Sequence, residues 1–206
     1  MWKKILILIF LMLTACATGN RYDYRSEAVV LPMKANGQMK VMLFVEDLRP
    51  YVMSGEKGAD VVGLQRGGFG NPFDVKTTSG RPLVEDMRAS IAAGLSHSGY
   101  DVSAAGAESD LAELTDTARQ HEATRILWLR VREWKSDIYM GIRLDYDLNL
   151  RVYDVDGTLL AENTMQGSGP VGGMKLSPGR NSQHMAQEFS KRIGYLFNDP
   201  SVRSAL

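Results

Sequence analysis

The chain has 206 residues, which is the length of one globular domain or of one domain with an elaborated terminus. Its 24 lysine and arginine residues balance 24 aspartate and glutamate residues, and this neutral balance argues against a nucleic-acid binder, which usually carries a basic surplus or stripe. A single cysteine excludes an internal disulfide framework and any zinc site built from cysteines.

The first residues have the pattern of a secretory signal peptide. Lys3 and Lys4 precede an unbroken apolar run from Ile5 to Leu13. This run is too short to span a bilayer, which takes about 20 residues, but it has the length of a signal-peptide core. The segment Leu13-Thr14-Ala15-Cys16 then resembles a bacterial lipobox, in which small residues precede a cysteine that receives a diacylglycerol. An ordinary signal peptide with a chance cysteine is the alternative.

The resemblance to lipoproteins implies cleavage before Cys16, so that residues 1–15 are the signal peptide and the mature amino terminus carries lipid. Ala17 follows the cysteine, where lipoproteins kept in the inner membrane of enteric-type bacteria typically have aspartate. The resemblance therefore implies a position at the periplasmic face of the outer membrane.

The first part of the mature chain is polar, and an apolar strand follows it. Residues 16–39 are rich in turn formers, and we expect them to be a tether that lifts the domain off the membrane. Residues 40–46 form a continuous apolar run bounded by charge, which favours a strand buried on both faces. The Gly-rich segment 51–80 has no clear period, and we expect two short strands of a hairpin within it, at 61–64 and 73–75.

Two helices, each followed by a strand, come next. Apolar residues recur at spacings of three and four over residues 83–97, with acidic residues in the first turn, and this pattern predicts a helix. A short strand is expected at 100–103. A second helix over 109–122, with Ser109 as its cap, is expected to lead into a strand at 124–134.

The clearest pattern in the chain is the alternation of apolar and polar residues over 142–153. A strict period of two over this length is typical of a long antiparallel strand with one solvated face. Asp156-Gly157 predicts a hairpin turn into a partner strand at 158–166. A second Gly-rich loop, 167–180, is expected to lead into a last helix at 181–197.

These elements predict a single domain from residue 40 to residue 206. Their order is roughly β-(loop/hairpin)-α-β-α-β-β-β-α. This order favours an α+β fold with a mixed or antiparallel sheet, helices packed on one face and the other face partly solvated.

The sequence offers little for catalysis. His97, His121 and His184 fall on different predicted helices without ligand spacing, and no established catalytic or nucleotide-binding motif occurs. The segment 154–157 is similar to the start of a calcium loop, but Met165 stands at the twelfth position in place of glutamate, so turn chemistry explains it better. We therefore expect a protein without enzyme activity, metal or cofactor.

Four aromatic residues are candidates for binding a partner. Phe69 and Phe73 flank the Gly-Asn-Pro part of the first Gly-rich segment, where exposed rings would anchor a partner; the alternative is a loop folded back with both rings in the core. Trp134 and Tyr139 flank a charged segment and form a second possible contact surface.

The order of several short motifs resembles a known family. The lipobox is followed by the strand end Val45-Glu46-Asp47-Leu48-Arg49, a Gly-rich loop, and a helix that ends in Gly99-Tyr100-Asp101-Val102. Together these look like small Gram-negative lipoproteins of the YajG type, similar in layout to the periplasmic lipoprotein activators of peptidoglycan synthases and to transport-auxiliary lipoproteins. The resemblance implies an α+β domain like the amino-terminal module of TolB, with no catalytic residues.

The function that these observations favour is a non-catalytic, lipid-anchored periplasmic adapter that binds another component of the cell envelope, and not nucleic acid. The alternative is an envelope hydrolase or small-ligand-binding protein that uses the Asp145/Asp147 sheet face and the two Gly-rich loops. Arg143 and Arg151 alternate with these aspartates, so a cross-strand charge lattice is the default interpretation. Convergent carboxylates of raised pKa in a pocket would favour the alternative, and a flat surface with exposed aromatic rings would favour the adapter.

Overall fold

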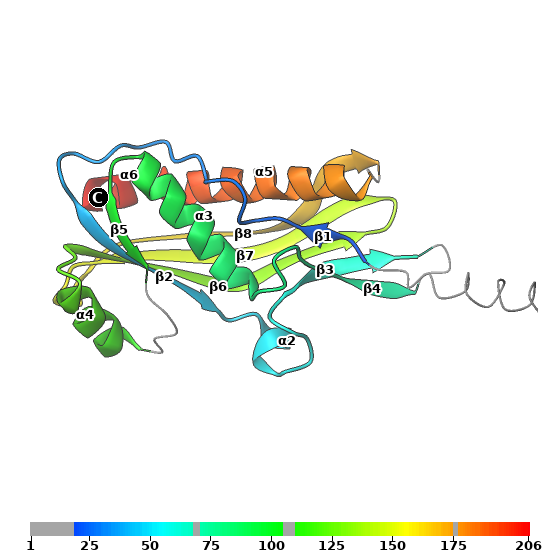
Figure 1. Cartoon of the computed structure of the whole chain (residues 1–206), viewed down its shortest axis with the longest axis horizontal. Helices are drawn as coiled ribbons and strands as arrows, with labels where there is room; N and C mark the ends of the chain where they lie inside the picture. The colour runs from blue at the N-terminus through cyan, green and yellow to red at the C-terminus, as the bar shows by residue number, and fades with distance from the viewer. Residues whose placement is uncertain (1–18, 68–70, 105–109, 175–176) are drawn as a thin grey trace, which may run out of the picture.

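The computed structural model describes residues 19–67, 71–104, 110–174 and 177–206. Figure 1 shows one long curved sheet with helices against it. The strands are β1 Arg21–Tyr22, β2 Lys40–Asp47, β3 Val61–Arg66, β4 Pro72–Thr77, β5 Asp101–Ala104, β6 Arg125–Ile138, β7 Gly141–Tyr153 and β8 Leu159–Met174. The helices are α2 Pro50–Met53, α3 Leu83–His97, α4 Leu111–Gln120, α5 Pro178–Phe197 and α6 Pro200–Ala205.

The strand β6 organises the sheet, because it pairs along both of its edges. On one edge, β2 lies parallel to its first half and β3 lies parallel to its last residues. On the other edge, β7 pairs antiparallel along nearly the whole length of β6, and β8 pairs antiparallel with β7. β5 extends the sheet beyond β2, while β4 and β1 extend it beyond β3. The sheet is therefore mixed, and the predicted α+β class is confirmed.

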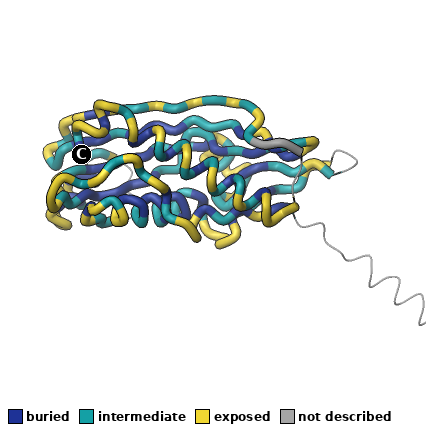
Figure 2. The backbone as a smooth tube through the Cα atoms, turned by 90° about the horizontal axis from the view of Figure 1, so that it is seen from above, coloured by how far each residue is buried: buried dark blue, intermediate teal, exposed yellow. Residues whose placement is uncertain are grey.

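The main core lies between the sheet and the helices α3, α5 and α6 (Figure 1). The inward-facing residues of β7 follow the predicted period of two, with Leu144, Leu148 and Leu150 fully buried. An aromatic cluster forms the middle of this core, where Tyr24, Trp134 and Phe189 pack edge to face. Figure 2 shows buried residues along the length of the strands and exposed residues gathered at the loops and margins.

A second, smaller core lies on the opposite face of the sheet. There α4 packs Leu114 and Ala118 against Phe44 and Trp128 of the parallel pair β2 and β6. Since β2 has buried side chains on both faces, its continuous apolar run is explained, as predicted. Helices were expected on one face only; α4 is the exception, and it covers one end of the other face (Figure 1).

The predicted tether at residues 16–39 is wrong for the part that the structure describes. Tyr22, Tyr24 and Val29 are buried in the main core, and β1 pairs with β4. We call residues 19–35 the strap, because this segment passes over α3 and α5. The amide of Val29 donates to the Ser90 carbonyl of α3, and other strap contacts reach Ser190 of α5. The strap is ordered because its scattered apolar side chains are buried by elements far away in the sequence.

The second Gly-rich segment is also different from the prediction, because residues 167–174 continue β8 instead of forming a loop. They pair with β7, and Tyr146 lies opposite Gly167. A Cβ atom at Gly167 would lie 2.7 Å from the Tyr146 hydroxyl, so glycine provides room for that ring. Glycine in a strand frequently marks such a close approach.

Other elements agree with the sequence. The helix α3 has the predicted bounds, and β3 and β4 form the predicted hairpin. The helix α4 begins after Asp110, whose side chain accepts a hydrogen bond from the Glu113 amide. Asp110 is therefore the cap, and not Ser109 as predicted. Ser109 lies outside the described residues. Among the described residues, no helix combines the length and apolarity needed to cross a bilayer.

Candidate functional site

The strand-end motif that contributed to the family resemblance builds a buried hydrogen-bond network. Arg49 is 0% exposed, and its guanidinium makes a two-pronged ion pair with Asp47, at 2.8 and 2.7 Å. The same group donates to the carbonyls of Val61 and Ala59 at 2.6 and 2.9 Å. Arg49 therefore joins the end of β2 to the segment that starts β3, and it also donates to the Tyr51 hydroxyl of α2 at 3.5 Å. We interpret the motif as a structural clamp on this junction.

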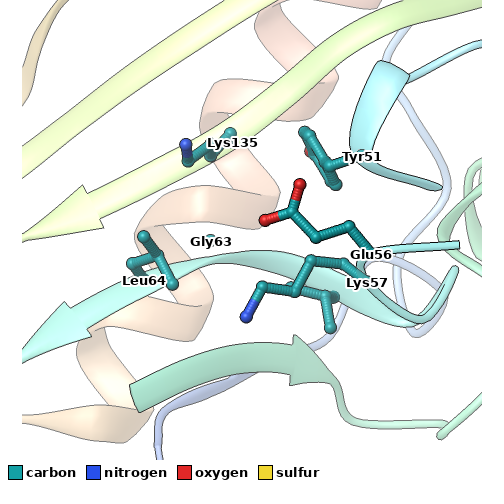
Figure 3. Close-up of a pocket in the computed structure, with 7 residues that line it drawn as sticks. Tyr51, Glu56, Lys57, Gly63, Leu64 and Lys135 are labelled. Atoms are coloured by element: carbon teal, nitrogen blue, oxygen red, sulfur yellow. The ribbon is translucent and has the colours of Figure 1, made fainter. Parts of the chain in front are cut away.

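A cleft of about 240 Å³ lies beside this clamp, between α2, β3 and β6 (Figure 3). Tyr51, Lys57 and Lys135 line it, together with Glu56 and Leu64. In Figure 3 the Glu56 carboxylate points across the cleft towards β6, and Lys57 points towards β4. Lys57 is held by Asp74 at 2.9 Å, and the Lys135 ammonium lies 5.9 Å from the centre of the Tyr51 ring. The cleft thus presents mixed charge around one aromatic ring.

One carboxyl group beside the cleft has a raised pKa. Burial raises the pKa of Glu133, although its carboxylate accepts a hydrogen bond from the Tyr51 hydroxyl at 3.1 Å and from the Trp134 amide at 3.0 Å. Burial also raises the pKa of Tyr51. Glu133 is thus a buried, hydrogen-bonded acid beside the cleft.

The Asp145/Asp147 face is a charge lattice. The Asp145 carboxylate lies 3.6 Å from the Arg143 guanidinium on the same strand, and it accepts from the Ser168 hydroxyl on β8. The Asp147 carboxylate lies 3.9 Å from Arg132 on β6. The described contacts therefore support the interpretation of this face as a cross-strand charge lattice. No group of three or more histidine, cysteine or acidic side chains in the described part of the chain is arranged to hold a metal ion.

Trp134 was predicted to lie on a contact surface, and that prediction is wrong. Its side chain is 0% exposed, and its indole nitrogen donates to the Tyr24 hydroxyl at 3.0 Å. The cause is a register shift in the pairing of β6 with β7 between Val131 and Glu133. An extra residue in a strand moves all later side chains to the other face, and the shift turns Trp134 inward.

The other predicted contact residues have different positions. Tyr139 is 59% exposed at the turn between β6 and β7, next to Met140, which is 78% exposed. Phe73 is half-buried in β4, where its ring lies close to Gly67. Phe69 and the predicted lipidation residue Cys16 lie outside the described residues. The structure therefore leaves Tyr139 as an accessible candidate, and sequence reasoning missed its neighbour Met140.

A surface groove of about 480 Å³ between the strap and α5 was also missed. Val30, 77% exposed, and Tyr195, 53% exposed, lie in it beside Lys191 and Glu27. The groove exists because the strap is ordered over α5, and the Val30 amide donates to the Ser190 hydroxyl at 3.0 Å. Since the sequence predicts a tether for the strap, no local signal reveals the groove.

Comparison with known proteins assigns no family. No family model matches the chain, and no curated protein matches it. Among solved structures the chain is similar to protein XCC0632 from Xanthomonas campestris, of the DUF330 family model, at 13% identity over 82% of this chain and 92% of that one, with a TM-score of 0.47. It is also similar to the PelC dodecamer from Paraburkholderia phytofirmans, at 14% identity over 82% and 93% of the chains with a TM-score of 0.40. A third similar structure is lipoprotein GNA1162 from Neisseria meningitidis, at 9% identity over 74% and 99% of the chains with a TM-score of 0.32. The YajG-type resemblance remains a prediction.

Proposed function

We propose that this chain is a lipid-anchored, non-catalytic adapter of the bacterial cell envelope, held at the periplasmic face of the outer membrane and binding another envelope component. The observation that carries the proposal is the position of the lipobox. Its Cys16 is the chain's only cysteine, and it stands three residues before Gly19, where the described part of the domain begins.

The start of the domain is firmly attached to the sheet, so a lipid on Cys16 would confine the whole domain. The Asn20 amide donates to the Gln65 side chain at 3.2 Å, and the Lys76 amide donates to the Asn20 carbonyl at 3.1 Å. Three extended residues reach about 10 Å at most. Confinement at a surface raises the effective concentration of a partner in the same layer, which is the physical advantage of an anchored adapter.

The groove between the strap and α5 supports the partner-binding part of the proposal. Tyr195 offers an exposed ring and Val30 an exposed apolar side chain, with Lys191 and Glu27 at the margin. Protein interfaces combine such an apolar, aromatic centre with a polar rim. We assign the envelope partner to this groove.

The alternative function, an envelope hydrolase or small-ligand binder at the Asp145/Asp147 face, has weaker support. Arginine side chains lie within ion-pair distance of both aspartates. The second Gly-rich segment, which was expected to contribute a loop to this site, belongs to β8 as far as residue 174. The cleft beside Tyr51 is one place on the described surface that a small ligand would fit.

The anchor is tested by the substitution Cys16→Ser in the full chain. We expect the variant to leave the outer-membrane fraction and appear in the soluble periplasmic fraction, and we expect the mass of the native mature protein to match acylation at a new terminus at Cys16. A variant that still fractionates with the outer membrane, or native protein with a free thiol, would contradict the proposal.

The partner surface is tested by placing a photo-crosslinking amino acid at Tyr195 in intact cells. We expect a discrete crosslinked species, identified by mass spectrometry as an envelope component. The matched control is the same probe at Ala112, which is exposed on α4, on the opposite face of the sheet. Equal crosslinking at both positions would show random collision and overturn the groove assignment.

A further inference from the structure

Two large apolar side chains stand side by side and exposed at one end of the sheet. Tyr139 and Met140 form the turn between β6 and β7 and are 59% and 78% exposed. They line a shallow groove together with Arg66, Arg143 and Pro170. Contiguous exposed apolar surface is one of the features that mark a site of contact with a protein or a membrane.

The sheet pairing places this turn at the end where the described chain begins. β1 runs parallel to β4, so Gly19 lies against Asp74; a Cβ at Gly19 would be 2.0 Å from the Asp74 carbonyl oxygen. In the β3–β4 pair, Pro72 is opposite Arg66. Figure 1 shows β1 and the β3–β4 hairpin at the same end as the turn between β6 and β7.

The pairing of β3 with β6 completes the connection to Tyr139. Gln65 lies beside Ile138 in parallel register, and the Arg66 guanidinium is bonded to Asp137 at 2.7 Å. Neighbouring strands lie about 4.8 Å apart, so three steps across the sheet, from β1 through β4 and β3, separate β1 from β6 by about 14 Å. We call this end, formed by the β6–β7 turn and by Arg66 and Pro72 at the adjacent ends of β3 and β4, the anchor end.

The length of chain before the domain limits where a membrane can lie. Only Ala17 and Thr18 separate Cys16 from Gly19, and these three steps reach about 10 Å at most. The lipid attachment point is therefore held within roughly 30 Å of Tyr139, as the sum of this reach, the three strand steps from β1 to β6 and about 7 Å along β6 from Asp137 to Tyr139. A bilayer that takes up the lipid has its surface close to the anchor end.

The chemistry of the anchor end suits the interfacial layer of a bilayer. Tyrosine has an apolar ring with a polar hydroxyl and is enriched where hydrocarbon meets headgroups. Arg66 and Arg143 flank the two apolar side chains, and both guanidinium groups are partly exposed. Each guanidinium already pairs with a carboxylate, Arg66 with Asp137 and Arg143 with Asp145. The exposed N–H groups of each are donors for the phosphate oxygens of lipid headgroups.

We propose that the anchor end docks on the membrane, with Tyr139 and Met140 in the interfacial layer of the leaflet that holds the Cys16 lipid. The docking rests on the lipidation in the proposed function and adds a fixed orientation to it. The domain then stands on the membrane with the β7–β8 turn at its far end, which leaves the groove at Tyr195 facing the periplasm.

The test compares two single-cysteine substitutions in the full lipidated chain, Met140→Cys at the anchor end and Leu159→Cys at the far end. Both replace exposed apolar residues. Each variant carries a nitroxide label in vesicles of phosphatidylethanolamine and phosphatidylglycerol. We expect collisions with a water-soluble nickel complex to be severalfold less frequent at residue 140 than at residue 159, and collisions with oxygen to be more frequent. Equal exposure to water at both positions would overturn the docking.

Two controls separate the possible failures. The chain without an added cysteine reports on Cys16 alone: labelling of that thiol would refute the lipidation and with it the proposed function, whereas a blocked Cys16 with a water-exposed label at residue 140 refutes only the docking. The same Met140→Cys label in a Cys16→Ser background, without vesicles, reports on association between copies. Protection from the nickel complex there would mean that a second copy covers the turn, which would also overturn the proposal.

Discussion

At the scale of single residues, Arg49 shows how a charged side chain becomes part of a core. Its partners are one carboxylate, two backbone carbonyls and the Tyr51 hydroxyl, and all of them are close to it in sequence. A buried guanidinium is tolerated only when such partners replace water. The motif that resembles a family signature therefore has a structural explanation that needs no ligand.

Replacement of this arginine should destabilise the domain strongly. We expect Arg49→Ala to lower the free energy of unfolding by about 3–5 kcal/mol, because it leaves Asp47 and two carbonyls without their partner. Urea denaturation measures this effect. The control is Arg81→Ala, whose exposed pair with Glu85 is 3.7 Å long and should contribute less than about 0.5 kcal/mol. Similar losses for the two variants would contradict the clamp.

Asp86 gives a prediction about pH. Its side chain is almost fully buried in the first turn of α3, and burial raises the pKa of this carboxyl despite a hydrogen bond from the Ser79 hydroxyl and Arg25 at 3.8 Å. A raised pKa means that the folded state holds the proton more tightly than the unfolded chain. The contribution of Asp86 to stability therefore falls as the pH rises above about 4, the ordinary aspartate value.

The substitution Asp86→Asn removes this titration. We expect the stability of the variant relative to the native protein to increase as the pH is raised from 4 to 7, and urea midpoints at several pH values measure it. Other carboxyl groups titrate equally in both proteins, so the difference isolates Asp86. If the stability of Asp86→Asn relative to the native protein fell with rising pH, the folded state would favour the charged form of Asp86, which would contradict the prediction.

At the scale of elements, the strap depends on one glycine in α3. A Cβ at Gly94 would lie 2.4 Å from the Val29 carbonyl oxygen, so the absence of a side chain lets the strap approach the helix. The strap could not be predicted from its own residues, because their partners, such as Trp134 and Ser190, lie more than 100 residues away.

The close approach reverses the usual effect of a helical glycine. Glycine to alanine inside a helix normally stabilises by up to about 1 kcal/mol, but Gly94→Ala should destabilise, because the new methyl group displaces the strap. Gly179 in α5 has open space around it and serves as the control, where alanine should be neutral or stabilising. Thermal or urea unfolding compares the two, and stabilisation by Gly94→Ala would show that the strap is loosely held.

Strands and helices with a strong local period agree best with the sequence. The helix α3 and the strand β7 were predicted nearly to their ends, since each alternates apolar and polar residues with its own period. The strand β6 was predicted too short, and the side of Trp134 was wrong, because the register shift after Val131 changes the phase within one strand. A prediction that assumes regular alternation along the whole strand does not reveal such a shift.

At the scale of the whole molecule, the proposed orientation on the membrane rests on the small number of residues between Cys16 and the sheet. This gives a prediction that does not alter the domain. Insertion of a Gly-Ser spacer of about 12 residues after Thr18 gives the chain a root-mean-square reach of roughly 20 Å. We expect the protein to remain in the membrane fraction while the label at residue 140 becomes more accessible to the nickel complex.

The spacer variant separates anchoring from orientation. If the tight connection supplies the orientation, the label is exposed in the spacer variant; a label that stays protected would show that Tyr139 and Met140 bind the bilayer strongly without help from the short connection. Membrane fractionation provides the control, because loss of the protein from that fraction would mean that the insertion disturbed lipidation.

The sequence by itself determined the features that depend on neighbours along the chain. These are the candidate lipidation signal at Cys16, the β3–β4 hairpin, the helix α3 and the amphipathic strand β7. Each depends on residues within one helix turn or one strand, so a local pattern carries it.

Only the tertiary structure decided which residues are accessible. It buried Trp134 and the strap, paired the glycines of β8 with β7, and brought Tyr139 to the end where the described chain begins. Burial and proximity depend on packing between segments that are distant in the sequence, and no periodicity records which partner a side chain meets. The candidate surfaces of this protein therefore come from the arrangement of its elements and not from any motif.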